Sequence, residues 1–212
     1  MPSSNITTNI IGSGLGGLAT AIRLARQGHS VTVFEKNPGP GGKMNSIGKD
    51  NFRFDTGPSL LTLPELVDEL LSDAPEHIKS LFRPLKLANI CKYFFPDGTV
   101  MNTPSDPDEF SRTFSGLTGE KKENIDTYLE KVHELYDLTA PVFIFGNFHR
   151  RKELFQPQNL KVLFNLHRLN PFSSMHAYNR RSFGHDSVVQ LFDRYATYNG
   201  SSPYKAPDTL NV

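Results

Sequence analysis

The first 35 residues carry a short β-branched segment and a later segment with the two-residue period of a strand, separated by one segment with a helical period. Residues 5–11 are short and β-branched and lead into a glycine, so they predict a buried strand. From 15 to 27 the apolar side chains recur at helical spacing, with arginines on the opposite face, and residues 30–35 alternate again. Strand, helix and strand together have the length of one βαβ unit, whose strands run parallel with a right-handed crossover.

Beyond residue 60 the pattern becomes mixed and then mainly helical. The expected elements are short strands at 44–47 and 52–54, a helix at 64–71, a hairpin of 91–95 with 99–102, and helices that begin at 106, run from 118 to 139 with Thr118 as the N-cap, and cover 154–169 and 185–198. Residues 201–212 show no closing element. A doubly wound sheet needs more parallel strands than are found here, so the α/β Rossmann-like unit is expected to be incomplete.

A glycine-rich motif lies between the first strand and the first helix. GSGLGG at residues 12–17 matches G-x-G-x-x-G, with Gly12, Gly14 and Gly17 at the three glycine positions. The first permits a tight turn, the second lets the backbone approach a pyrophosphate, and the third lets the helix pack close to the strand. Glu35 follows 18 positions after Gly17, close to the distance of about 20 expected for an acid that binds a ribose hydroxyl. The alternative, a chance glycine turn with a solvated acid, is disfavoured by this context.

Composition narrows the functional classes. A net charge of +1 over 212 residues does not favour a nucleic-acid binder. No apolar run reaches the roughly 18–20 residues that span a bilayer, and residues 1–5 do not read as a secretory signal. Cys91 is the only cysteine, which fits a reducing compartment. The histidines lack metal-ligand spacing, so we expect no metal site, and no nucleophile motif identifies a catalytic residue.

A second glycine pair distinguishes FAD from NAD, since both cofactors use the same fingerprint. Gly41-Gly42-Lys43 resembles the G-G-[RK] element of flavoproteins in the amine oxidase and carotenoid desaturase superfamily. In that superfamily the glycine pair lets the chain pass close to the cofactor, and the basic residue lies beside it. A flexible surface loop is the alternative. The position of Gly42, seven residues after Glu35, favours the flavin interpretation.

Two further motifs resemble the bacterial-type phytoene and carotenoid desaturases. FDTGPS at residues 54–59 is similar to their F-D-x-G-P-S segment, and residues 194–203 are similar to their R-x-x-T-Y-x-G-x-x-P segment. The resemblance covers essentially the whole chain. It implies FAD as the cofactor, with Arg194 as a structural or flavin-adjacent residue. The FAD-binding residues that we expect are Gly12, Gly14, Gly17, Glu35, Lys36, Gly42, Lys43, Asp55 and Gly57.

The resemblance also implies a domain division and partners. Residues 1–60 are expected to bind the ADP part of FAD, and residues 61–212 to face the substrate and a membrane. The substrate class is a long apolar polyene, for which phenylalanines offer a lining; the candidates are Phe94, Phe95, Phe143, Phe145, Phe148, Phe155, Phe164 and Phe172. An apolar segment at 141–148 followed by basic residues at 149–152 suits peripheral attachment to an anionic membrane from the cytoplasm. The alternative for that segment is a buried turn followed by solvated charges.

Family members are longer than this chain, so it resembles their N-terminal part. The resemblance therefore leaves room for a C-terminal partner chain that completes the cofactor site. For the isolated chain the expectations are weak binding of the ADP part alone, or aggregation through an unfilled sheet edge. Two other functions stay open: another flavoprotein of the amine oxidase superfamily, and a non-catalytic nucleotide-binding remnant or subunit.

Overall fold

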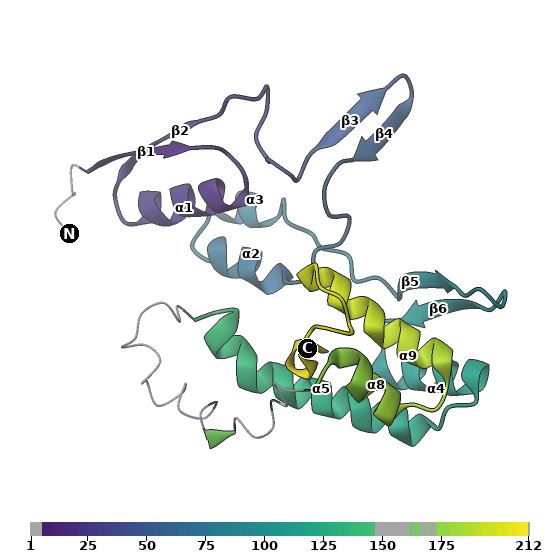
Figure 1. Ribbon diagram of the computed structural model, residues 1–212. Coiled ribbons are helices and arrows are strands. Elements are labelled where there is room, and N and C mark those ends of the chain that lie inside the picture. Colours follow the sequence, from purple (N-terminus) through teal and green to yellow (C-terminus); the bar gives the residue numbers. More distant parts are fainter. Residues whose placement is uncertain (1–5, 147–161, 163, 166–168, 170–172, 212) are drawn as a thin grey trace. The chain divides into compact units, whose positions relative to one another are not determined.

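A computed structural model describes residues 6–146, 162, 164–165, 169 and 173–211. The chain divides into two compact units, Met1–Lys86 and Leu87–Val212, and each is described by itself (Figure 1). The sequence analysis instead divides the chain at residue 60, into a part that binds the ADP portion of FAD and a part that faces the substrate, and this functional division stays a prediction. The predicted helix at 154–169 lies largely outside the described residues.

The first unit begins with the βαβ arrangement that the sequence predicts (Figure 1). Strand β1 (Thr7–Ile11) leads into helix α1 (Leu15–Arg26), and strand β2 (Ser30–Phe34) returns beside β1. The two strands pair in parallel, in a register that places Thr7 opposite Ser30. Helix α1 stops where Gly28 adopts a φ of 88°, a left-handed conformation that favours glycine. The fold of this unit is therefore Rossmann-like.

The rest of the first unit consists of a hairpin and two short helices. Strands β3 (Ser46–Lys49) and β4 (Phe52–Asp55) form an antiparallel pair, and helices α2 (Pro64–Leu70) and α3 (Glu76–Lys79) follow. The sequence did not predict α3, which is a single turn. Helix α2 and the residues after it are linked to α1 by the ion pairs Arg23–Glu69 and Arg26–Asp73. These side chains are exposed, so each pair stabilises the unit only weakly.

Apolar side chains remain exposed around the two parallel strands. Ile11 is 92% exposed, Leu15 59% and Phe34 55%. Parallel sheets are ordinarily covered on both faces, and β1 and β2 form a sheet of two strands among the described residues. Apolar surface on both sides of the turn between β1 and α1, and at the end of β2, is therefore left uncovered within this unit.

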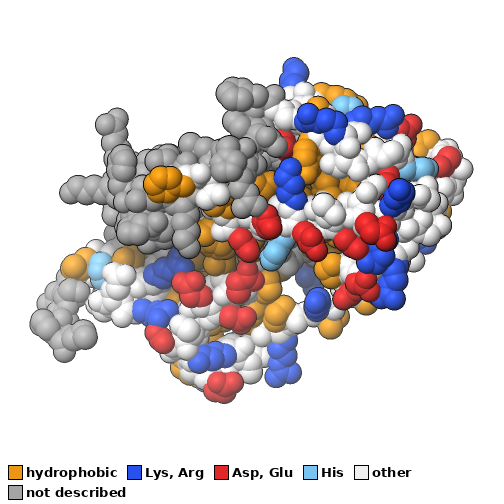
Figure 2. Space-filling model, turned by 90° about the horizontal axis from the view of Figure 1, so that it is seen from below, with side chains coloured by type: hydrophobic (Ala, Val, Ile, Leu, Met, Phe, Trp, Pro, Cys, Tyr) orange, Lys and Arg blue, Asp and Glu red, His pale blue; other side chains and the backbone are white. Residues whose placement is uncertain are grey.

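The second unit packs helices against a hairpin. Strands β5 (Asn89–Phe94) and β6 (Val100–Pro104) pair in antiparallel fashion. They are followed by helices α4 (Pro107–Thr118), α5 (Lys122–Phe143), α8 (Met175–Ser182) and α9 (Asp186–Asp193), and by the 3₁₀ helices η2 (Arg194–Asn199) and η3 (Asp208–Asn211). The main core is rich in aromatic side chains; its rings come from Phe110, Phe114, Tyr128, Phe183 and Phe192. On the face shown in Figure 2, acidic and basic side chains are intermixed.

The structure of this unit differs from the sequence predictions at four points. Thr118 does not cap the long helix: it is the last residue of α4, where its hydroxyl donates to the Phe114 carbonyl, and Gly119 then turns the chain at a φ of 73°. The helix predicted at 185–198 is divided into α9 and η2. Helix α8 was not predicted, and the segment without a predicted closing element contains η3.

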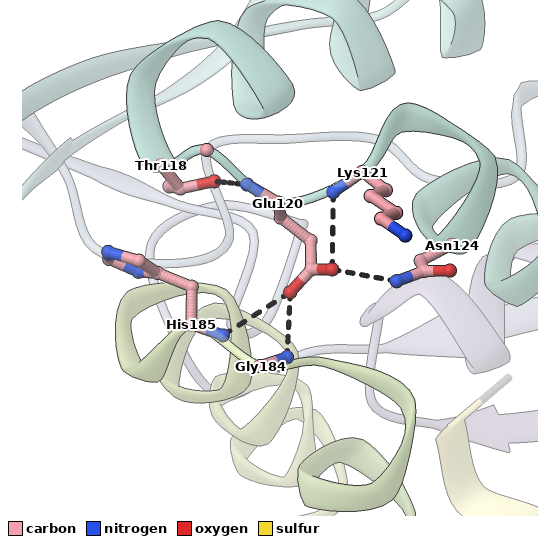
Figure 3. Close-up of a pocket in the computed structure, with 7 residues that line it drawn as sticks. Thr118, Glu120, Lys121, Asn124, Gly184 and His185 are labelled. Carbon is pink, nitrogen blue, oxygen red and sulfur yellow. Dashed lines mark hydrogen bonds between the residues drawn. The ribbon is translucent and has the colours of Figure 1, made fainter.

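A single carboxylate joins the turn between α4 and α5 to the turn between α8 and α9 (Figure 3). Glu120 is only 8% exposed. One of its oxygens accepts hydrogen bonds from the Lys121 amide at 3.2 Å and from Asn124 Nδ2 at 2.8 Å. The other accepts the amides of Gly184 at 2.7 Å and His185 at 3.2 Å. The pocket between the two turns is lined by Glu120, Gly184 and His185. The Glu120 carboxylate already accepts the amides that an external anion would need. We therefore interpret the role of Glu120 as structural.

The same environment sets the protonation of Glu120. Burial raises the pKa of this carboxyl, but the hydrogen bonds from Asn124, Gly184, His185 and Lys121 outweigh burial and hold the pKa below its ordinary value. A carboxyl whose pKa falls on folding stabilises the folded state above its unfolded pKa, and this contribution is lost as the pH falls through the folded pKa.

We predict that Glu120→Gln lowers the free energy of unfolding by about 1–3 kcal/mol at neutral pH, because it leaves buried donors without a full set of acceptors. The difference from wild type should shrink as the pH falls through the folded pKa of Glu120. Urea denaturation at a series of pH values measures this, with the exposed Glu130→Gln as the matched control. A constant difference at every pH would contradict the assignment.

Candidate functional site

The glycine motif forms the turn between β1 and α1. Gly12 adopts a φ of 97° and donates its amide to the Phe34 carbonyl at 2.7 Å, which ties the turn to the end of β2. Helix α1 begins at Leu15, directly after Gly14. Gly14 is the N-cap residue, so no side chain caps the helix there, and the first turn of α1 contains no acidic residue. The amides at the start of α1 and the positive end of the helix dipole can therefore bind an anion.

The second glycine pair lies against the first motif. The Gly41 amide donates to the Ser13 carbonyl at 2.8 Å, and Gly41 forms an isolated parallel bridge with Gly14. A Cβ atom on Gly42 would lie 3.1 Å from the Cα of Gly14. Gly41 and Gly42 have φ values of 118° and 62°, in the left-handed region where a side chain is disfavoured. Two motifs that are distant in sequence thus form one backbone surface.

The glycines of the first motif are needed for different reasons. A Cβ atom on Gly17 would overlap the carbonyl of Gly12, so the close packing of α1 onto the turn requires glycine there. Gly14, by contrast, has a φ of −70° and a ψ of 174°, which any residue adopts. The nearest atom to a Cβ at Gly14 would be the Gly42 Cα at 3.9 Å. Folding therefore does not require glycine at position 14, whereas the close approach of a ligand would.

Glu35 lies directly beside this surface, at the end of β2. Its Oε2 atom accepts the Ser13 amide and the Ser13 hydroxyl, both at 2.8 Å. Its Oε1 atom accepts the Asn37 amide at 2.9 Å and Asn37 Nδ2 at 2.7 Å. The Ser13 amide, followed by the Asn37 amide, lowers the pKa of Glu35 to about 2. The carboxylate is therefore ionised at neutral pH and fixed in orientation.

The segment around Asp55 continues the same site. A Cβ atom on Gly57 would overlap the Lys43 carbonyl, and the Thr56 amide donates to the Asn45 carbonyl at 2.8 Å. The two segments enclose an open hollow of about 390 Å³, lined by Met44, Asn45, Ser46, Arg53, Asp55, Gly57 and Pro58. Gly57 therefore continues, through Lys43, the surface that Gly14 and Gly42 begin.

The predicted site residues thus divide into two groups. The structure brings together the main chains of Gly12, Gly14, Gly17, Gly42, Lys43 and Gly57, the side chain of Glu35, and the hollow that Asp55 lines. Lys36 and Lys43 have exposed side chains. The sequence reasoning missed Ser13 and Asn37. Ser13 occupies a variable position of the motif and Asn37 lies in a loop, so no pattern indicated that both bind Glu35.

Arg194 belongs to the second unit, where it has a clear packing role. Its guanidinium lies over the rings of Tyr93, Tyr195 and Tyr198, at 5.1, 5.3 and 5.5 Å from their centroids. Cation–π contacts of this kind link strand β5 to η2. These contacts give Arg194 a structural role, one of the two roles expected from the sequence. The other role, a position next to the flavin, stays a prediction.

Among the phenylalanines suggested as a substrate lining, those that the structure describes are not buried members of the main core. Phe94, Phe143, Phe145 and Phe164 are each more than half exposed, and Phe95 packs on the edge of the core. Phe148, Phe155 and Phe172 lie outside the described residues. In the part of the chain that the structure describes, no helix is long and apolar enough to cross a membrane. Within the same residues, no group of three or more His, Cys, Asp or Glu side chains could hold a metal ion.

Comparison with known proteins supports the fold. Residues 10–74 match the family described as the NAD(P)-binding Rossmann-like domain. The whole chain is similar to a solved structure of a putrescine oxidase variant, with a TM-score of 0.55 over 98% of this chain and 41% of the other. The sequence identity is 15%, so this likeness concerns the fold alone.

Curated relatives give a more specific likeness. A 1-hydroxycarotenoid 3,4-desaturase from Flavobacterium sp. (strain P99-3) is 38% identical over 96% of this chain and 41% of its own length. A 4,4'-diapolycopene oxygenase from Methylomonas sp. is 32% identical over 96% of this chain and 40% of its own. A phytoene desaturase from Cercospora nicotianae is 33% identical over 100% of this chain and 34% of its own. The chain thus spans about two fifths or less of the length of these relatives, and over nearly all of its own length its sequence is similar to theirs.

Proposed function

We propose that this chain forms the nucleotide-binding part of an FAD-dependent oxidoreductase that desaturates a carotenoid precursor. The observation that carries the proposal is the meeting of the glycine turn, Glu35 and the second glycine loop around Gly14. The sequence similarity to carotenoid desaturases supports FAD rather than NAD as the bound dinucleotide. In this proposal residues 1–60 hold the ADP part, and residues 61–212 face the substrate.

The residues of the first unit suit the ADP half of FAD. The amides at the start of α1 would bind the pyrophosphate, and Gly14 would leave room for it. The ionised Glu35 would accept a ribose hydroxyl, while Asp55 and Gly57 would lie beside the later part of the cofactor. When bound, FAD would supply the two-electron acceptor needed to convert a C–C bond into a C=C bond.

The proposed substrate is a long apolar polyene of the phytoene or diapophytoene type, drawn from a membrane. Phe143, Ile144 and Phe145 at the end of α5 are 55%, 50% and 51% exposed. Basic residues follow at 149–152, outside the described residues. Exposed aromatic and aliphatic side chains next to basic residues suit peripheral binding to an anionic bilayer. We propose that the protein acts there from the cytoplasm, with a partner chain or segment completing the site.

The first test separates ligand space from folding. Gly14→Ala should leave the free energy of unfolding unchanged but weaken the binding of FAD or ADP by about tenfold or more, because the added methyl occupies space needed by the pyrophosphate. Gly17→Ala should instead destabilise the fold by about 1–3 kcal/mol through overpacking against Gly12. Isothermal titration and urea denaturation measure the two effects. Unchanged nucleotide binding by a folded Gly14→Ala protein would refute the site.

The second test concerns the reaction. The protein, together with the partner chain or segment that completes the site, is loaded with FAD and mixed without oxygen with liposomes that contain phytoene or a 1-hydroxycarotenoid. The proposal predicts bleaching of the oxidised-flavin absorption band, with one new C=C bond formed for each flavin reduced. Protein loaded with the same flavin but without polyene is the control. Flavin that stays oxidised with every polyene would contradict desaturation.

The similarity to a 4,4'-diapolycopene oxygenase supports oxygenation of a polyene as a second candidate reaction. Mass spectrometry of the product after oxygen is admitted separates the two, because oxygenation adds the mass of oxygen whereas desaturation removes two hydrogens.

A further inference from the structure

The hydrogen bonds of Glu35 leave it no spare acceptor site. An ionised carboxylate has about four lone-pair sites, and four donors occupy them: the amide and hydroxyl of Ser13, and the amide and side-chain Nδ2 of Asn37. A ribose hydroxyl that binds Glu35 must therefore displace one of these donors. The structure indicates which donor is the easiest to displace.

Three of the four donors are held in place. The two backbone amides belong to the glycine turn and to the bend after β2, so they move only with the main chain. The Ser13 hydroxyl belongs to a residue that is 4% exposed, at the centre of the turn. The Asn37 side chain, in contrast, is exposed and carries its donor on a rotatable chain. Water can replace its partner when it swings away.

We infer that Asn37 holds the place of a ribose hydroxyl on Glu35, and that Ser13 is the positioning residue that keeps the carboxylate oriented for the exchange. This inference rests on the proposed function, because it assumes that an adenosine ribose binds at Glu35. The Asn37 amide saturates Oε1 while the site is empty and leaves when the nucleotide arrives. Loss of its hydrogen bond is then a cost of binding, whereas the Ser13 hydrogen bonds persist.

The two side chains should therefore have opposite effects on affinity. Asn37→Ala and the size-matched Asn37→Leu should bind ADP about threefold to tenfold more tightly than wild type, the range that one hydrogen bond supplies. Ser13→Ala should bind ADP more weakly by a similar factor, because Glu35 loses one fixed partner. Isothermal titration with ADP as the probe measures both, and Asn51→Ala, at an exposed asparagine in the β3–β4 turn, is the matched control.

A nucleotide without ribose hydroxyls distinguishes this exchange from a structural effect. ADP that lacks both hydroxyls (2',3'-dideoxy-ADP) has nothing to exchange with Asn37, so its affinity should be equal in wild type, Asn37→Ala and Ser13→Ala. If wild type prefers ADP but Asn37→Ala binds it no more tightly, the place-holder role is overturned while the proposed site stands. If wild type does not bind ADP, or if Asn37→Ala binds both nucleotides equally, the proposed ribose contact itself fails and the inference fails with it.

Discussion

The contact between the main chains of Gly14 and Gly42 is the constraint on which the candidate site depends. Two other parts of the site adjoin it: the start of α1 follows Gly14, and the segment of Gly57 packs on the carbonyl of Lys43. A Cβ atom on Gly42 would lie 3.1 Å from the Gly14 Cα, so glycine is needed at position 42 for the two loops to meet. Because backbone rather than side chains forms this surface, it presents amides to a ligand at close range and suits a phosphate group.

In the proposed site, Glu35 is the residue that would select the ligand. The amides of Ser13 and Asn37 lower the pKa of its carboxyl group, so the carboxylate is ionised at neutral pH. Hydrogen bonds rather than a neighbouring cation cause this shift. An anion at that position favours a ribose hydroxyl as its ligand and disfavours a phosphate on the same ribose. The turn that in our proposal accepts the pyrophosphate also orients the acid, through Ser13. Folding of one short turn would thus arrange both halves of the proposed adenosine diphosphate site.

The sequence predicted the βαβ unit well because its signals are local. Gly12, Gly17, the β-branched residues of β1 and the alternation in β2 each favour one conformation, and the parallel register confirms the unit. The partners of Glu35 were not predictable, because Ser13 and Asn37 fill positions where many residues fit. Thr118 shows the other limit: a threonine between two helices can end the first or cap the second, and Gly119 decides in favour of the first. Glu120 is a long-range partner, 64 residues from Gly184, and has no pattern in the sequence.

The central claim is that the amides at the start of α1, together with Glu35, bind adenosine diphosphate. Amide chemical shifts of the ¹⁵N-labelled protein, titrated with ADP and separately with adenosine, test it most directly. The account predicts that ADP shifts the amides of Leu15, Gly16 and Gly17 together with those near Glu35, and that adenosine shifts only the latter. Shifts confined to residues 87–212, with the glycine turn unchanged, would contradict it.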